Sequence, residues 1–136
     1  MKKTFVILIL LIFNGCNQSL ESSSINLEEK YNIYISKLSN EQIEENLNKG
    51  LKPIAIKDNI DVKGFANTAG SIALKNNDPD NNAFLIQKLV DNGYFVIGKT
   101  NLSEWANFRS SSSTSGWSSM GGQTINPYGE MRTPCG

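Results

Sequence analysis

Two short apolar runs that flank a helical segment constrain the fold of this chain more than any other feature. The runs are Pro53–Ile56 and Tyr94–Ile97, and each is compact enough for a buried strand. Between them, apolar residues recur at helical spacing from Ala83 to Val90, and Asn92-Gly93 then ends the helix. Strand, helix and strand in this order imply two parallel strands joined by a right-handed crossover. The sequence therefore predicts an α/β fold.

Upstream of the first strand, the pattern predicts two helices. Apolar residues at helical spacing favour a helix over residues 26–38. Ser39 and Gln42 have the spacing of a capping box, in which each side chain accepts a hydrogen bond from a free backbone N–H at the start of a helix. A second, short helix is therefore expected over residues 40–48.

Downstream of the second strand, the sequence becomes polar. Asn101 and Glu104 are spaced like a capping box and predict one more short helix. Residues 109–123 are rich in Ser and Gly. Their hydroxyls and backbone N–H groups could line a polar pocket, and the alternative is a flexible loop that carries no site.

The first 15 residues have the pattern of a signal peptide. Two lysines precede an apolar stretch over residues 4–13, which is too short to span a ~30 Å hydrocarbon core as a helix. The stretch ends in Phe13-Asn14-Gly15-Cys16, which resembles the lipobox of bacterial lipoproteins. This resemblance implies that Cys16 is lipidated and anchors an exported protein to a membrane of the bacterial cell envelope. The alternatives are an uncleaved apolar anchor and a buried strand.

These features divide the chain into three segments. Residues 1–15 are the expected signal peptide of lipoprotein type, and residues 16–25 are the expected lipidated cysteine with a polar tether. Residues 26–136 are then the folded part. If Cys16 is lipidated, Cys135 has no intramolecular partner, so the stability of this part must come from packing.

The composition excludes several classes of function. The 136 residues contain no His, which removes every catalytic scheme and zinc site that depends on an imidazole. The 13 basic and 13 acidic residues give a net charge of zero and form no basic stripe, so no nucleic-acid partner is expected. Without His or clustered Cys, the sequence suggests no metal and no cofactor.

Lys57 is the residue whose position suggests chemistry. It closes the apolar run Pro53–Ile56, and strand ends are where α/β proteins commonly place reactive groups. A charged lysine is costly at a buried strand end, so Lys57 could be held neutral and act as a base. The alternative is a solvated lysine without a catalytic role.

Several unusual segments occur between residues 53 and 136. In chain order they are PIAIKDNIDVKG, TAGS, GYFVIGKTNLSEWANFRSSSS, GGQTINPYG and RTPCG. Together they resemble the amidase signature family, and they are most similar to its peptide amidase type. Because several such segments occur in the order that the family has, this resemblance is more specific than any single motif.

The resemblance implies a fold, a reaction and roles for particular residues. The family has an α/β fold in which helices surround a mixed sheet, and it hydrolyses carboxamides with a serine nucleophile, a second serine in a cis peptide, and a lysine. By resemblance, Lys57 is that lysine. The Ser-rich run belongs to the loop near the substrate pocket, so Ser111, Ser112 and Ser113 are expected to line it. No cofactor is implied, and the implied partner is a small-molecule or peptide amide.

In the family, the two catalytic serines follow the Pro-Cys-Gly element, with which this chain ends at Gly136. We therefore expect the chain to be the N-terminal portion of an amidase and to be inactive alone. The alternative is that the short chain is itself the product, a non-catalytic lipoprotein that keeps part of an amidase scaffold.

Overall fold

The structure is a computed structural model that describes residues 27–108 and 110–134. The chain divides into two units, residues 1–30 and residues 31–136, and the following description concerns the second unit. The expected signal peptide and Cys16 lie outside the described residues. Within the described residues, none of the helices has both the length and the apolar character that crossing a membrane requires.

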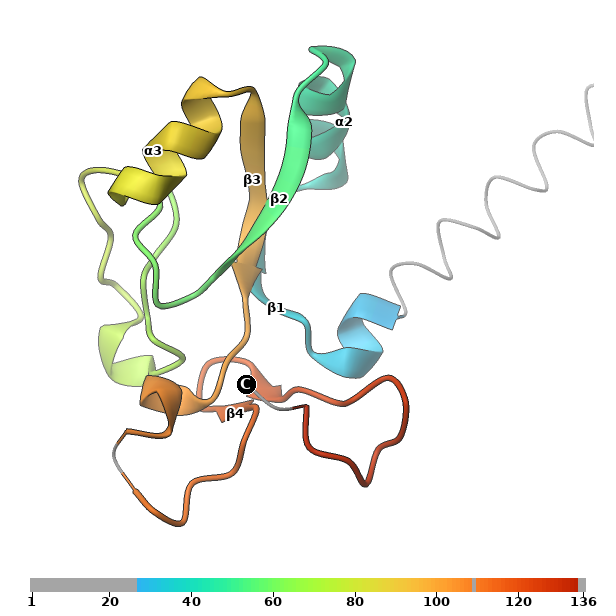
Figure 1. Cartoon of the computed structure of the whole chain (residues 1–136), viewed down its shortest axis with the longest axis vertical. Helices are drawn as coiled ribbons and strands as arrows, with labels where there is room; N and C mark the ends of the chain where they lie inside the picture. Colours follow the sequence, from blue (N-terminus) through green and yellow to red (C-terminus); the bar gives the residue numbers. More distant parts are fainter. Residues whose placement is uncertain (1–26, 109, 135–136) are drawn as a thin grey trace, which may run out of the picture. The chain divides into compact units, whose positions relative to one another are not determined.

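A mixed three-stranded sheet forms the centre of this unit (Figure 1). Its order is β1 (Tyr34–Lys37), β3 (Tyr94–Thr100) and β2 (Lys52–Lys57). The two apolar runs of the sequence are β2 and β3, which pair in parallel, whereas β1 is antiparallel to β3. The predicted α/β fold with a mixed sheet is confirmed.

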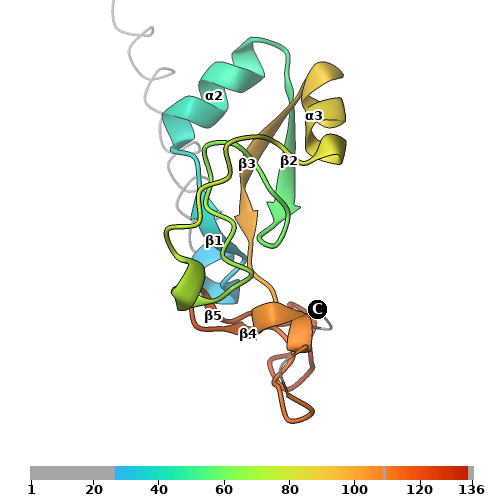
Figure 2. The same ribbon diagram turned by 90° about the vertical axis from the view of Figure 1, so that its left-hand side faces the viewer.

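Two helices accompany the parallel strands, and Figure 2 shows them on opposite sides of the β2–β3 pair. Helix α2 (Asn40–Asn48) precedes β2, and α3 (Phe84–Asp91) joins β2 to β3. The predicted capping box of α2 is present, because the Ser39 side chain accepts from the Gln42 N–H and the Gln42 side chain accepts from the Ser39 N–H. Both helices agree with their sequence-based predictions.

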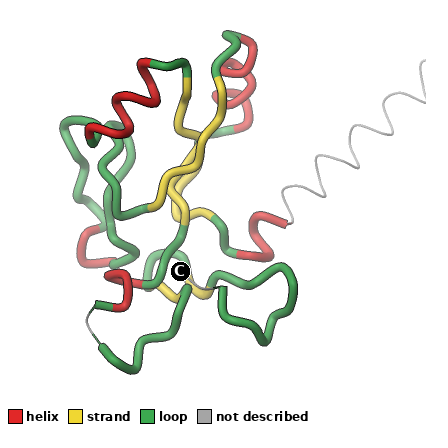
Figure 3. Tube along the Cα trace, in the orientation of Figure 1, coloured by secondary structure: helices red, strands yellow, loops and turns green. Residues whose placement is uncertain are grey.

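The hydrophobic core is small and lies between α3 and the sheet. Its buried members are Ile56 of β2, Ile86 of α3 and Val62 of the loop after β2, and partly buried apolar side chains surround them. Figure 3 shows that the connection from β2 to α3 is mostly loop, with the short 3-10 helix η1 (Ile72–Leu74) within it. This long connection carries most of the polar groups described below.

The predicted helix over residues 26–38 is wrong beyond Tyr31. Residues 27–31 are helical, but Asn32 has a φ of +50°, which an α-helix does not accommodate. The chain then enters β1, which pairs with β3, and the Leu38 N–H donates to the Ile97 carbonyl at 2.9 Å. Pairing with a strand about 60 residues away overrides the local helical pattern.

The capping box predicted for Asn101 and Glu104 is also wrong. The 3-10 helix η2 (Glu104–Asn107) begins after Ser103, which makes no side-chain cap. Asn101 Oδ1 instead accepts from the Ser118 hydroxyl at 2.7 Å, and Glu104 Oε2 accepts from the Ser119 N–H at 2.8 Å. Both side chains therefore hold the hairpin of β4 (Trp117–Ser118) and β5 (Gly122–Gln123), which lies within the predicted Ser/Gly-rich loop.

Candidate active site

A β-bulge between β2 and β3 decides which way two lysines face. The register shifts by one residue midway along the pair, where Ile97 of β3 has no partner on β2. Without this shift, Lys57 would lie opposite Lys99. With it, Lys57 pairs with Thr100 and Lys99 pairs with Ile56. Because paired residues share a face of a sheet and neighbours along a strand alternate, the two ammonium groups are directed to opposite faces.

Lys57 lies at the carboxyl end of β2 with an exposed side chain, whereas Ile56 before it is buried. The expectation that the strand would bury Lys57 is wrong for the described residues. The physical reason is that β2 is at the edge of the described sheet and that every second side chain of a strand faces away from the core. Lys57 is thus accessible at the end of a strand.

Lys99 is the lysine that is buried, with 0% of its side chain exposed. All three donors of its ammonium are used by carbonyl oxygens of the loop after β2. These are the carbonyls of Asp58 at 3.3 Å, Ile60 at 2.8 Å and Ala66 at 3.2 Å. Burial lowers the pKa of Lys99, and the negative charges of Asp58 and Asp61 partly oppose this effect.

Asp58, which follows Lys57 directly, is fully buried as well. Its Oδ2 accepts from the backbone N–H groups of Thr68 and Gly70, both at 3.1 Å, and from the Thr68 hydroxyl. Its Oδ1 makes no hydrogen bond and lies 3.9 Å from Lys99 Nζ. The carboxylate therefore joins the end of β2 to the segment 68–71, the TAGS motif of the sequence.

The segment 68–71 also contacts the C-terminal hairpin and η2. The Trp105 N–H donates to the Ala69 carbonyl at 2.9 Å, and the Met120 N–H donates to the Gly70 carbonyl at 3.1 Å. Gly70 has a φ of +74°, and a Cβ there would lie 2.8 Å from the Ser118 Cβ. Only glycine fits this position, so the close approach of the hairpin depends on it.

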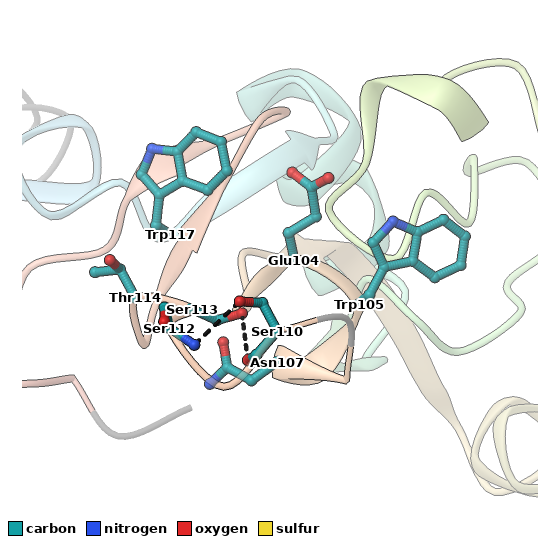
Figure 4. Close-up of a pocket in the computed structure, with 8 residues that line it drawn as sticks. All are labelled: Glu104, Trp105, Asn107, Ser110, Ser112, Ser113, Thr114 and Trp117. Atoms are coloured by element: carbon teal, nitrogen blue, oxygen red, sulfur yellow. Dashed lines mark hydrogen bonds between the residues drawn. The ribbon is translucent and has the colours of Figure 1, made fainter.

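A pocket of about 430 Å³ opens beside η2 and the Ser-rich loop (Figure 4). Ser112 and Ser113, two of the three predicted substrate-binding residues, line it together with Ser110, whereas Ser111 does not. The Ser113 hydroxyl donates to the Ser110 carbonyl at 3.0 Å, and the Ser112 N–H donates to the Ser110 hydroxyl at 3.0 Å. The remaining lining residues are Glu104, Trp105, Asn107, Thr114 and Trp117.

The backbone that forms one wall of this pocket is strained. Trp105, Ala106 and Asn107 have φ values of +52°, +52° and +62°, a left-handed turn of three non-glycine residues. Each such residue costs roughly 1–2 kcal/mol. Strain of this kind concentrates at functional sites, where the surrounding structure maintains it. The pocket combines hydroxyls, a carboxylate and two indoles, a lining suited to a polar ligand with an apolar side chain.

The sequence-based prediction named Lys57 and the Ser-rich loop as site candidates, and it did not include the buried pair of Lys99 and Asp58. The signal for them was present, because each is a charged residue beside an apolar strand. The bulge that turns Lys99 inward lies beside Gly98, and a glycine inside a strand pattern is its one local signal. Among the described residues, 27–108 and 110–134, no three His, Cys, Asp or Glu side chains are grouped so that they could hold a metal ion.

The amino-acid sequence is similar to those of known amidases and of an amidotransferase. The sequence model of the family described as Amidase matches residues 25–136. A glutamyl-tRNA(Gln) amidotransferase protein of Methanosarcina acetivorans is 48% identical over 84 residues, 62% of this chain and 17% of that protein. Mandelamide hydrolase of Pseudomonas putida is 56% identical over 54 residues, 40% of this chain and 11% of that protein.

The fold is similar to that of a solved amidase structure. The X-ray structure of native peptide amidase from Stenotrophomonas maltophilia has a TM-score of 0.67 and 42% sequence identity to this chain. The similarity covers 79% of this chain and 24% of that one. The chain therefore spans about a quarter or less of the length of each of these three proteins.

Proposed function

Because the chain belongs to the Amidase family, we propose that the protein of which it forms part hydrolyses carboxamide C–N bonds and that Lys57 is its base. The observation that carries this proposal is the placement of Lys57, exposed at the carboxyl end of β2 and followed directly by a buried Asp58 whose Oδ2 accepts three hydrogen bonds. The side chain of such a lysine is accessible to a second catalytic group, and hydrogen bonds of Asp58 fix the backbone that follows it.

The proposed reaction proceeds through an acyl-enzyme. Lys57, the proposed base, accepts a proton from a bridging serine, which in turn takes the proton of the serine nucleophile as that oxygen attacks the amide carbon. The proton then returns from Lys57 through the bridging serine to the leaving amine or ammonia as the C–N bond breaks. Water adds to the acyl carbon, the ester bond to the serine breaks, and the acid and the free serine hydroxyl result. Both serines follow the Pro-Cys-Gly element in the family, so they would lie in a continuation beyond Gly136. The use of lysine as base is compatible with a sequence that contains no His.

The pocket beside η2 is proposed as part of the substrate site. Ser112 and Ser113 would face the polar part of the amide substrate, with Ser111 at the rim. Trp105 and Trp117 would contact its apolar part, because indole rings bury large apolar area and still carry a hydrogen-bond donor.

The activity is tested with a protein that extends this chain through the two serines. We expect it to release ammonia from a C-terminally amidated dipeptide, from mandelamide or from glutamine, without added metal or cofactor. These three substrates correspond to the three relatives described above and separate a peptide amidase, a small-amide hydrolase and a glutamine-dependent amidotransferase. Hydrolysis of none of them would contradict the proposal and favour the non-catalytic scaffold.

We further propose that the protein is exported and lipid-anchored through Cys16. The apolar stretch over residues 4–13 and the Gly15-Cys16 junction support this proposal. Mass spectrometry of the protein from the membrane fraction of a bacterial host is expected to give an N-terminal Cys16 that carries acyl chains. Cys16→Ser is expected to release the protein from the membrane fraction. An unprocessed N-terminus at Met1 would contradict this proposal without bearing on the amidase activity.

A further inference from the structure

The loop after β2 is held from within by a single ammonium group. Lys99 Nζ, which approaches from β3, donates to carbonyl oxygens at three different points of the loop, in Asp58, Ile60 and Ala66. Three carbonyls that converge on one buried cation cannot rearrange independently, because each would lose its donor in a buried or partly buried place. The ammonium therefore ties three points of the loop to one another.

Asp58 extends this constraint in two directions. Its backbone N–H donates to the Thr100 carbonyl at 3.1 Å and so fixes the peptide bond that follows Lys57. Its carboxylate accepts from Thr68 and Gly70 and so fixes the segment that contacts η2 and the pocket. One residue thus links the base to the pocket wall.

Direct attraction between the two charges is not the main effect. Lys99 Nζ and Asp58 Oδ1 are 3.9 Å apart, longer than the 2.7–2.9 Å typical of a charge-assisted hydrogen bond. A buried ion pair is also a weak source of stability, because the desolvation of both charges offsets their attraction. The main effect of the two charges is to fix the positions of the backbone groups that they bind.

We propose that Lys99 and Asp58 are positioning residues of the amide-hydrolysing site, which together fix the backbone of Lys57 relative to the segment 68–71 and the pocket wall. This inference rests on the proposed function, since it names two residues that act through Lys57. Neither residue contacts substrate in it. Both act by holding the base at the distance and angle that proton transfer requires.

The test uses the extended protein with Lys99→Met, which keeps the length of the side chain and removes the ammonium. We expect kcat per folded molecule to fall about 10²-fold, the size of effect that a displacement of about 1 Å produces, with KM changed less than about twofold. Lys52→Met is the matched control, since Lys52 is an exposed lysine at the opposite end of β2. A purely structural role would lower the yield of folded protein and leave kcat per folded molecule unchanged, and that result would overturn the proposal.

A milder variant covers the case in which Lys99→Met does not fold. Thr68→Val removes the hydroxyl that donates to Asp58 and also accepts from the Gly70 N–H, and it keeps the shape of the buried side chain and both N–H donors to Asp58. We expect it to fold and to lower kcat about tenfold with little change in KM. Wild-type kcat in folded Thr68→Val, together with wild-type kcat or no fold in Lys99→Met, would overturn the proposal.

Amide hydrogen exchange separates this proposal from the amidase proposal. In the wild-type protein, the N–H groups of Thr68 and Gly70 are expected to exchange slowly, and in Lys99→Met or Thr68→Val they are expected to exchange faster, while α2 is unchanged. If the wild-type protein hydrolyses no amide, the amidase proposal fails and the exchange data alone decide the holding role. Unchanged exchange at Thr68 and Gly70 would overturn that role.

Discussion

Lys57→Ala is expected to lower kcat by about 10²- to 10⁴-fold in a protein that carries the two serines, the range typical of a lost general base. The fold should be unaffected, because the Lys57 side chain is exposed and does not belong to the core cluster of Ile56, Val62 and Ile86. Steady-state kinetics on the amide that the wild-type protein hydrolyses best, with far-UV circular dichroism of both proteins, measures both effects.

Two controls give this experiment its meaning. Lys52→Ala removes the exposed lysine at the start of the same strand and is expected to leave kcat unchanged. Lys57→Arg keeps a positive charge but cannot be neutral near pH 7, so it should be nearly as inactive as Lys57→Ala. Full activity of Lys57→Ala would end the assignment of Lys57 as the base, whatever the substrate proves to be.

Gly98→Ala is expected to destabilise the fold by about 3 kcal/mol or more, at the upper end of what overpacking costs. A Cβ at Gly98 would lie 2.5 Å from the Ser36 carbonyl oxygen and 3.0 Å from the Lys37 Cα. Both atoms belong to the backbone of β1, so no side-chain rotation relieves the clash, and β1 must move away from β3. Thermal unfolding of the extended protein, with and without the substitution, measures the loss.

The matched control for Gly98→Ala is Gly50→Ala. Gly50 has a φ of +76°, and a Cβ there meets nothing within 4 Å. The expected cost is therefore only the roughly 1–2 kcal/mol of a left-handed alanine. Gly98 itself does not have a positive φ, so its expected cost arises only from the approach of β1. Destabilisation by Gly98→Ala that does not exceed that of Gly50→Ala would contradict this prediction.

The elements that local signals specify were predictable, and those that depend on distant pairing were not. The capping box at Ser39 and the apolar runs of β2 and β3 are local, and the structure confirms the helix and both strands. Strand β1 was predicted as part of a helix, because its residues have helical spacing and only the pairing with β3 makes them extended. Tertiary contacts decided in favour of the strand.

The same distinction applies to the candidate site. Lys57 follows an apolar run, so its place at a strand end could be predicted, and the hydroxyls of Ser112 and Ser113 could be placed beside a pocket. The exposure of Lys57 and the burial of Lys99 could not be predicted. The bulge at Ile97 places Lys57 and Lys99 on opposite faces of the sheet, and this separation depends on the register of two strands that about 40 residues separate. No single segment contains it.

The arrangement around Lys99 has a consequence for the dependence of this protein on its ionic surroundings. Three backbone carbonyls at 2.8–3.3 Å with a carboxylate at 3.9 Å form the kind of oxygen cage in which other proteins hold a monovalent metal ion. Here the cation is attached to the chain by its own side chain. The loop that follows the candidate base is therefore held by a cation that belongs to the chain, and we expect its order not to require sodium or potassium from the surrounding solution.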